Sequence, residues 1–223
     1  MNDRTANILD AAIQEFIETG DPVSSGRLYE RYDFGIKPAM IRLELDTLEA
    51  DGYLEQPYHS AGRVPSDAGY EFYVTRALAA REERLRSAEL KNLLERRAFA
   101  DLLSGLSSEL KLLSVAMDQA ADEIYKTGLA ALVDHLAWQD RGELRSVIRD
   151  FESVDERLPR AAGELDDTLR VFIGRKSPVT RSEHLSVVCA AFRTGAGGDI
   201  VSIFAIGPKR MDYKKAIRIF RSL

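Results

Sequence analysis

Apolar side chains recur at helical spacing near the start of the chain, and this pattern predicts three short helices. The first covers residues 4–19 and ends at Gly20, because a glycine commonly closes a helix. The second begins after Ser24 or Ser25, either of which can cap its first turn, and runs through Tyr32. A tight connection then leads into the third helix, whose two faces differ most clearly.

The third helix opens at Pro38, a residue tolerated in a first turn, and ends at Gly52. One stripe of this helix is apolar at positions i, i+4 and i+7, so it is expected to face a core. The stripe consists of Ile41, Leu45 and Leu48. The opposite face is expected to be exposed, and it consists of Ala39, Met40, Arg42, Leu43, Asp46 and Thr47.

Two strands joined in a hairpin are predicted after the third helix. The tip of the hairpin is placed at Ser60-Ala61-Gly62-Arg63, and a new helix begins after Pro65. Three short helices followed by a basic hairpin are typical of a winged helix-turn-helix, in which one helix and the hairpin contact DNA. The exposed face of the third helix and the hairpin tip therefore form the predicted binding surface.

The sequence beyond residue 66 predicts further helix, interrupted at Gly105. Residues 81–97 mix both signs of charge and are expected to form a solvated helix face that separates two domains. After Gly105 a narrow apolar seam recurs every three or four positions, which predicts packing of one helix on another. The spacing leaves open whether this packing lies within one chain or between subunits. The seam consists of Leu106, Leu110, Leu113, Met117, Ala121 and Ile124.

The remainder of the chain, from Gly128, contains both helical and strand patterns of apolar residues. Helices are predicted over residues 129–138, 141–152 and 214–223. Runs rich in Val, Ile and Phe predict strands at residues 169–174, 185–193 and 199–207, with a hairpin between the last two. The expected fold class is α+β, with a winged helix-turn-helix DNA-binding domain at residues 1–74, a helical linker at 75–126, and a small α+β domain with a mostly antiparallel sheet at 127–223.

Composition excludes several classes of protein. Hydrophobic residues make up 45% of the chain, enough for a packed core, and no apolar run approaches the roughly 20 residues that cross a bilayer. The N-terminus lacks the pattern of a signal peptide, so a cytoplasmic location is expected. The single cysteine, Cys189, excludes an internal disulfide, and its apolar strand predicts an inert core thiol.

Motifs for catalysis or cofactor binding are not found in the sequence. His59, His135 and His184 lack partners at ligand spacing, which argues against a metal site. The glycine-rich TGAGG lacks the lysine and the following helix of a phosphate-binding loop. No nucleophile is placed beside a base, so we expect neither an enzyme nor a cofactor.

The balance of charge is unfavourable for DNA binding. Residues 1–75 hold six Lys and Arg against fourteen Asp and Glu, a net charge of −8. Because affinity for DNA comes mostly from cations that contact phosphates, these few cations must gather on one face. The candidates for that face are Arg27, Arg31, Lys37, Arg42 and Arg63. We expect modest, salt-sensitive affinity per subunit, and therefore a need for dimerisation.

Arg63 and Arg42 each have a functional and a structural interpretation. Arg63 at the hairpin tip can enter a minor groove or clamp a phosphate, or it can be an ordinary surface arginine in a turn. Arg42 can contact a phosphate or a guanine edge, or form a salt bridge with Asp46 one turn later. Lys37 precedes the third helix, at a position where a side-chain oxygen that caps the helix is preferred. A lysine at this position would be favourable if a phosphate lay nearby. The predicted DNA-binding residues are Arg27, Lys37, Ala39, Met40, Arg42, Leu43, Thr47, Ser60 and Arg63.

A second polar cluster, GPKRMDY, precedes the last helix. Lys209 and Arg210 lie beside the expected N-terminus of this helix, where free amides favour an anion. The alternative is a turn between strand and helix in which Asp212 caps the helix and Tyr213 packs inward.

Several segments resemble the family of the heat-inducible transcription repressor HrcA. IRLELDTLEADGYLEQPYHSAGRVPSDAGYEFYV, residues 41–74, is similar to its N-terminal domain, above all in GYLEQP and in SAGR followed by V and P. LLSGLSSELKLLSVAMD, DEIYKTGLAALVDH, LRVFIGRKSP and VSIFAIGPKRMDYKKAI resemble later family segments in the same order. The resemblance implies a cytoplasmic homodimer with a GAF-like C-terminal domain. It also implies binding to an inverted-repeat operator, repression of chaperone genes, and the GroE chaperonin as a partner.

The sequence departs from this family in two ways. A block with further sheet strands and a dimerisation domain is missing between Met117 and Glu123, which implies a reduced sheet. Lys37, Met40 and Leu43 stand where the family has Ser, Thr and Asn, and the last two can contact only a thymine methyl. These substitutions support an alternative function: a ligand- or protein-sensing regulator whose winged domain is an interaction module with altered or lost operator specificity.

Overall fold

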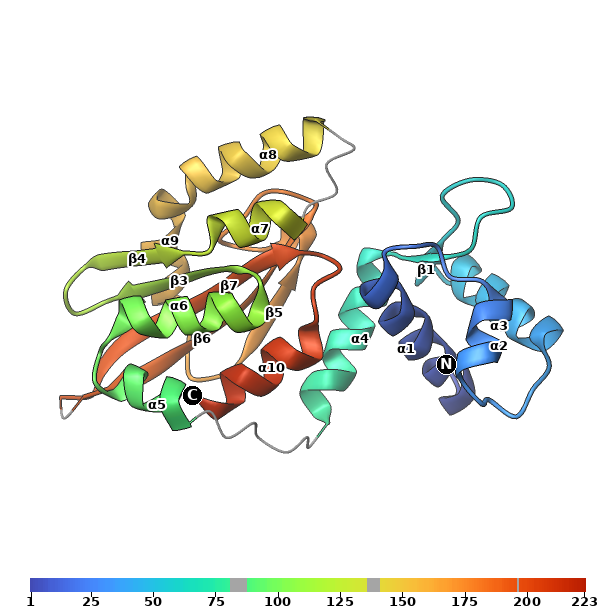
Figure 1. Cartoon of the computed structure of the whole chain (residues 1–223), viewed down its shortest axis with the longest axis horizontal. Coiled ribbons are helices and arrows are strands. Elements are labelled where there is room, and N and C mark those ends of the chain that lie inside the picture. Colours follow the sequence, from blue (N-terminus) through green and yellow to red (C-terminus); the bar gives the residue numbers. More distant parts are fainter. Residues whose placement is uncertain (81–87, 136–140, 196) are drawn as a thin grey trace. The chain divides into compact units, whose positions relative to one another are not determined.

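The computed structural model describes residues 1–80, 88–135, 141–195 and 197–223. The described chain divides into two compact units, Met1–Ala79 and Ala80–Leu223 (Figure 1). Parts of the predicted charged helix at 81–97 and of the helix at 129–138 lie outside the described residues.

The first unit has the predicted order of three helices followed by a hairpin. Its elements are α1 (Asp3–Thr19), α2 (Ser25–Arg31), α3 (Pro38–Ala50), β1 (Leu54–Glu55), β2 (Val64–Pro65) and α4 (Asp67–Ala79). Gly20 closes α1 in the left-handed conformation, as predicted. Ser24 is the residue that caps α2, because its side chain accepts a hydrogen bond from the Arg27 amide.

The apolar stripe of α3 faces the core of the first unit, as its spacing predicts. Ile41, Leu45 and Leu48 are all buried, and they pack with α1 and α2. Lys37 precedes the helix without making a side-chain cap, which leaves the amides of the first turn uncapped by any side chain.

The hairpin is shorter than predicted, and its tip is displaced. The turn lies at Tyr58–Ala61, where the Ala61 amide donates to the Tyr58 carbonyl at 3.0 Å. Arg63 lies instead at the base of the hairpin and exchanges two backbone hydrogen bonds of 2.8 Å with Val23. A Cβ at Gly62 would lie 2.6 Å from the Val23 carbonyl, so this close approach requires glycine. The prediction of Arg63 at the tip is therefore wrong.

The second unit is an α+β fold, which confirms the expected class. Its five strands are antiparallel in the order β4-β3-β7-β6-β5. The predicted strands correspond to β5 (Arg170–Ile173), β6 (Leu185–Thr194) and β7 (Asp199–Pro208). The remaining elements are α5 (Ala88–Glu95), α6 (Phe99–Leu110), β3 (Leu113–Asp118), β4 (Glu123–Thr127), α7 (Leu129–His135), α8 (Arg141–Glu152), α9 (Val154–Gly163), the short 3-10 helix η1 (Gly174–Lys176) and α10 (Tyr213–Ser222).

The predicted helical seam between Leu106 and Ile124 is wrong beyond α6. The helix ends at Leu110, with Lys111 in the left-handed conformation, and the chain continues as the β3–β4 hairpin. Leu113 and Met117 are four positions apart, a spacing that places residues on one face of a helix or of a strand. The segment at 75–126 is therefore not a purely helical linker, because it supplies two strands of the sheet.

Helices cover both faces of this sheet (Figure 1). Alternate residues of β3, β6 and β7 pack against α7, α8 and α9 in one core cluster that includes Val115, Val187 and Leu158. On the other face, α6 contacts β3 and β4, and α10 contacts β6. The helix α9 was not predicted, since its charged residues and Pro159 obscure the pattern.

Cys189 is fully buried within this core, as the apolar strand predicts. Burial raises the pKa of its thiol to about 12, so the reactive thiolate is scarce at neutral pH. Within the described ranges, no helix has the length and apolar character needed to cross a membrane. Those residues likewise contain no group of three or more His, Cys, Asp or Glu side chains arranged to hold a metal ion.

Candidate functional site

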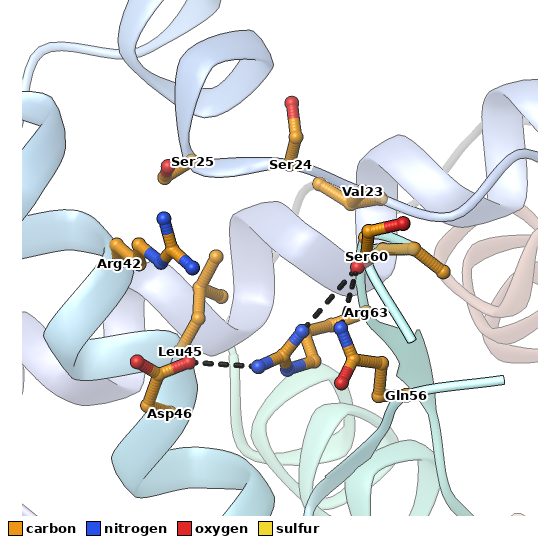
Figure 2. A pocket seen from close by; sticks show the side chains of 11 residues that line it. Val23, Ser24, Ser25, Arg42, Leu45, Asp46, Gln56, Ser60 and Arg63 are labelled. Atoms are coloured by element: carbon orange, nitrogen blue, oxygen red, sulfur yellow. Dashed lines mark hydrogen bonds and ion pairs between the residues drawn. The ribbon is translucent and has the colours of Figure 1, made fainter. Parts of the chain in front are cut away.

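A cavity of about 290 Å³ opens between the start of α2, the middle of α3 and the hairpin. We call it the α3 cavity. Figure 2 shows side chains from all three elements around it. Of the predicted binding residues, Arg42, Ser60 and Arg63 line it together. Its other polar lining residues are Ser24, Ser25, Asp46 and Gln56.

The predicted face of α3 is exposed beside this cavity. Ala39, Arg42 and Thr47 are all exposed. Met40 and Leu43 are also open to solvent, with 45% and 57% of their surface exposed. An exposed helix face of this kind can enter a major groove, and the two apolar side chains can contact a thymine methyl but no polar base edge.

Arg63 points toward α3 and is mostly buried. Its Nη2 donates to an Asp46 oxygen at 2.7 Å, and its side chain is only 14% exposed. Its Nε lies 2.7 Å from a Glu49 oxygen, a close ion pair that is not aligned as a hydrogen bond. The guanidinium is thus held by two carboxylates of α3 and does not project as a free clamp.

The pairing of Arg63 with Asp46 bears on the salt bridge that the sequence suggested between Arg42 and Asp46. Asp46 pairs with Arg63 across 17 positions of sequence, and the ion pairs of the described residues include none between Arg42 and Asp46. The salt bridge suggested by the one-turn spacing is therefore wrong. Arg42 lines the α3 cavity without an acidic partner in the described part of the chain.

Arg27 and Arg31 are turned toward the first helix. Arg27 Nε contacts Glu15, and Arg31 Nη1 lies 2.8 Å from the other Glu15 oxygen and 3.2 Å from Glu18. Glu15 is fully buried. Burial alone raises the pKa of the Glu15 carboxyl, but the hydrogen bonds from the two arginines outweigh it, so the pKa lies below its ordinary value.

The structure therefore does not gather the five predicted cations on one face. Arg27 and Arg31 serve the buried carboxylate of Glu15 and do not line the α3 cavity. Lys37 and Arg42 form no pair with an acidic side chain in the residues the structure describes. Arg42 lies on α3, and Lys37 immediately precedes the positive dipole end of that helix, where an anion is favoured.

Sequence reasoning missed part of the cavity lining. Ser24 and Ser25 were considered only as helix caps, although both side chains also line the cavity. Gln56 was not singled out, yet its Nε2 donates to the Ala61 carbonyl at 2.9 Å and braces the hairpin. The two adjacent serines at the start of the second helix were the only local signal in the sequence for these polar lining residues.

The second polar cluster forms the predicted capped turn. The Asp212 side chain accepts from the Lys215 amide, and Tyr213 is buried with its hydroxyl 2.9 Å from Ser186. Lys209 and Arg210 are half-buried in this turn. The structural alternative is confirmed for Asp212 and Tyr213, and anion binding by the two basic residues stays a prediction.

A family model described as the HrcA protein C terminal domain matches residues 71–217. The heat-inducible transcription repressor HrcA of Gloeobacter violaceus is 37% identical over 153 residues, covering 66% of this chain and 41% of that protein. The protein of the same name from Mycobacterium sp. (strain KMS) is 32% identical over 205 residues, covering 88% of this chain and 58% of that protein. That from Moorella thermoacetica is 51% identical over 74 residues, covering 33% and 22%.

The chain spans about half the length of several curated relatives that it matches. Among solved structures, the crystal structure of a protein described only as hypothetical shares its fold, with a TM-score of 0.77 at 18% identity. That match covers 99% of this chain and 95% of the other. The family match and the shared fold support the α+β, GAF-like architecture expected for the C-terminal part.

Proposed function

The chain belongs to the HrcA family, and from this premise we propose that it is a DNA-binding repressor of heat-shock or chaperone genes. It binds an inverted-repeat operator as a homodimer, in the cytoplasm, through the exposed face of α3 and the hairpin. The family resemblance adds a GroE-type chaperonin as a partner.

The observation that carries this proposal is that Arg42, which lies on α3 and lines its cavity, has no acidic partner among the residues the structure describes. Arg42 lines the same cavity as Ser24, Ser25 and Ser60, and its guanidinium offers several donors to a phosphate, in the way that proteins fix their register on a duplex. The exposed Met40 and Leu43 on the same helix would then lie against base edges.

The small number of available cations supports a dimer. One subunit offers Lys37 and Arg42 directly, while Arg63 is held by two carboxylates. Two-fold symmetry doubles the phosphate contacts and matches the symmetry of an inverted repeat. Affinity should therefore depend on both half-sites being present.

The test is to measure binding to inverted-repeat and scrambled duplexes at several salt concentrations. We expect preference for the repeat, and a negative slope of log affinity against log salt. Arg42→Ala should weaken binding about tenfold and reduce that slope by about one per subunit. Arg76→Ala is the matched control, since Arg76 is an α4 arginine paired with Asp10, and it should leave binding unchanged. No salt slope and no preference would reject the proposal.

A second candidate function is favoured by the apolar character of the exposed face. Met40, Leu43 and the hairpin residue Tyr58, which is 67% exposed, suit a protein or ligand contact rather than polar base readout. In that case the wild type binds no operator. Combining Met40→Thr with Leu43→Asn should then create binding, and a double variant that still fails to bind would count against this candidate.

A further inference from the structure

A second arginine-lined cavity lies within the Ala80–Leu223 unit, apart from every residue that the proposed function uses. It has a volume of about 180 Å³ and is formed by the end of α8, the start of α9 and the loop before β6. We call it the Arg157 cavity. Its lining consists of Arg149, Asp150, Ser153, Arg157, Arg181 and Ser182.

The one carboxylate of this lining is fully engaged by its neighbours. Asp150 is buried, and one of its oxygens accepts from the backbone amides of Arg181 and Ser182 at 2.8 and 3.0 Å. Its other oxygen accepts from Arg157 Nη2 at 2.5 Å. These bonds fix the loop before β6 against α8, and the charge of Arg157 balances that of Asp150.

Arg157 is held in a single orientation at the cavity wall. Its Nη2 also donates to the Asp150 carbonyl at 2.7 Å and to Ser153 Oγ at 3.0 Å. Its side chain is 15% exposed, and its Nε is buried without a hydrogen-bond partner among the described residues. Arg157 therefore forms a fixed part of the cavity wall and, through its bond to Asp150, cancels the negative charge of the lining.

Two further arginines supply surplus positive charge. Arg149 and Arg181 are exposed, and neither pairs with an acidic side chain in the described ranges. With Asp150 balanced by Arg157, the lining carries a net charge of about +2. Guanidinium groups match the oxygens of a phosphate or carboxylate in paired hydrogen bonds, and two surplus charges favour a dianion.

We propose that the Arg157 cavity binds a phosphoryl group, either as inorganic phosphate or as the phosphate end of a small metabolite. A volume of about 180 Å³ is large enough to admit a phosphoryl group. Arg149 and Arg181 bind its oxygens from α8 and from the loop before β6. The bound anion thereby ties α8 to the loop before β6.

The test is titration of the full chain with inorganic phosphate, followed by calorimetry and thermal unfolding at constant ionic strength. We expect saturable binding with Kd below about 1 mM. At 100 times Kd, the unfolding midpoint should rise by about 5 °C. The double variant Arg149→Gln/Arg181→Gln should weaken binding at least tenfold. Both side chains are exposed, so this variant is expected to fold.

The matched control is Arg145→Gln/Arg193→Gln, which removes the same charge from exposed arginines outside the cavity lining. It should bind phosphate like the wild type. Absence of saturable binding overturns the proposal, and so does equal binding by the Arg149→Gln/Arg181→Gln variant. A titration with glycerol phosphate distinguishes the two possible ligands. If glycerol phosphate binds more tightly than inorganic phosphate, the ligand is a phosphorylated metabolite; if it binds equally or more weakly, the ligand is inorganic phosphate. Since DNA is absent, failure here leaves the proposed function intact.

Discussion

The α3 cavity and the Arg157 cavity both hold an arginine beside a carboxylate, but the carboxylates differ in exposure. Asp46 and Glu49, which hold Arg63, have side chains 46% and 34% exposed, so their charge competes for any phosphate that approaches α3. Asp150, which holds Arg157, has a side chain only 5% exposed, and backbone amides occupy its second oxygen. The arginine–carboxylate pair therefore weakens anion binding in the α3 cavity, whereas in the Arg157 cavity it fixes the lining residues without repelling an anion.

This difference shows why a count of charges is a poor guide to binding. The first unit is strongly acidic, but Glu15 is buried and neutralised by Arg27 and Arg31. What matters at each cavity is which arginines have no acidic partner. Within the described parts of the chain, these are Arg42 in the α3 cavity, and Arg149 and Arg181 in the Arg157 cavity.

The largest loss of stability is expected when Asp150 is replaced, because its buried carboxylate holds Arg157 and two backbone amides. Asp150→Ala leaves Arg157 and two backbone amides without their acceptor and should lower the free energy of unfolding by about 3–5 kcal/mol. The control is Asp155→Ala, which removes a carboxylate 48% exposed and paired with Lys126, and should cost under about 1 kcal/mol. Urea unfolding measures both, and similar losses would refute the distinction between the two carboxylates.

A smaller loss of stability is expected when the buried carboxylate of the first unit is neutralised. Glu15→Gln removes the negative charge and one of the two acceptor oxygens that Arg27 and Arg31 share, and should cost about 2 kcal/mol. Because the folded pKa of Glu15 lies below the unfolded one, its bonds to the two arginines stabilise the unit above about pH 4.5, and this contribution is lost as pH falls through the folded pKa. Stability of the variant should therefore fall less steeply at acid pH, and parallel curves for the two proteins would contradict this.

The smallest expected effect is a gain of DNA affinity. Asp46→Asn/Glu49→Gln removes two exposed charges and frees Arg63 for a phosphate, so affinity for the operator should rise about tenfold, or about 1.4 kcal/mol. Asp51→Asn/Glu55→Gln removes equal charge from exposed residues that hold no arginine of the cavity. Its gain should be clearly smaller, and an equal gain would show that release of Arg63 contributes nothing.

Local patterns in the sequence were sufficient for the helices of the first unit and for three strands of the second. The stripe of Ile41, Leu45 and Leu48 and the exposed face opposite it follow from spacing alone. The β3–β4 hairpin was missed because Leu113 and Met117 fit both helical and strand periods.

The ionic partners could not be predicted from the sequence. Glu15 meets Arg27 and Arg31 across 12 and 16 positions, and Arg63 meets Asp46 across 17. Such contacts depend on how helices and hairpin pack, which no local spacing encodes. For the near-neighbour pair considered, Arg42 with Asp46, the described residues show Asp46 paired with Arg63 instead.

The most direct test of the central claim, that the exposed face of α3 contacts DNA, compares two matched threonines. Thr47 on α3 and Thr75 on α4 are both exposed, and each hydroxyl donates to the carbonyl four residues earlier. Since Cys189 is buried with a raised pKa, each Thr→Cys variant presents one reactive thiol, whose alkylation rate can be followed with and without operator duplex. We predict that saturating duplex slows alkylation of the Thr47→Cys thiol about tenfold or more and leaves that of Thr75→Cys unchanged. Equal rates for Thr47→Cys with and without duplex would contradict the account.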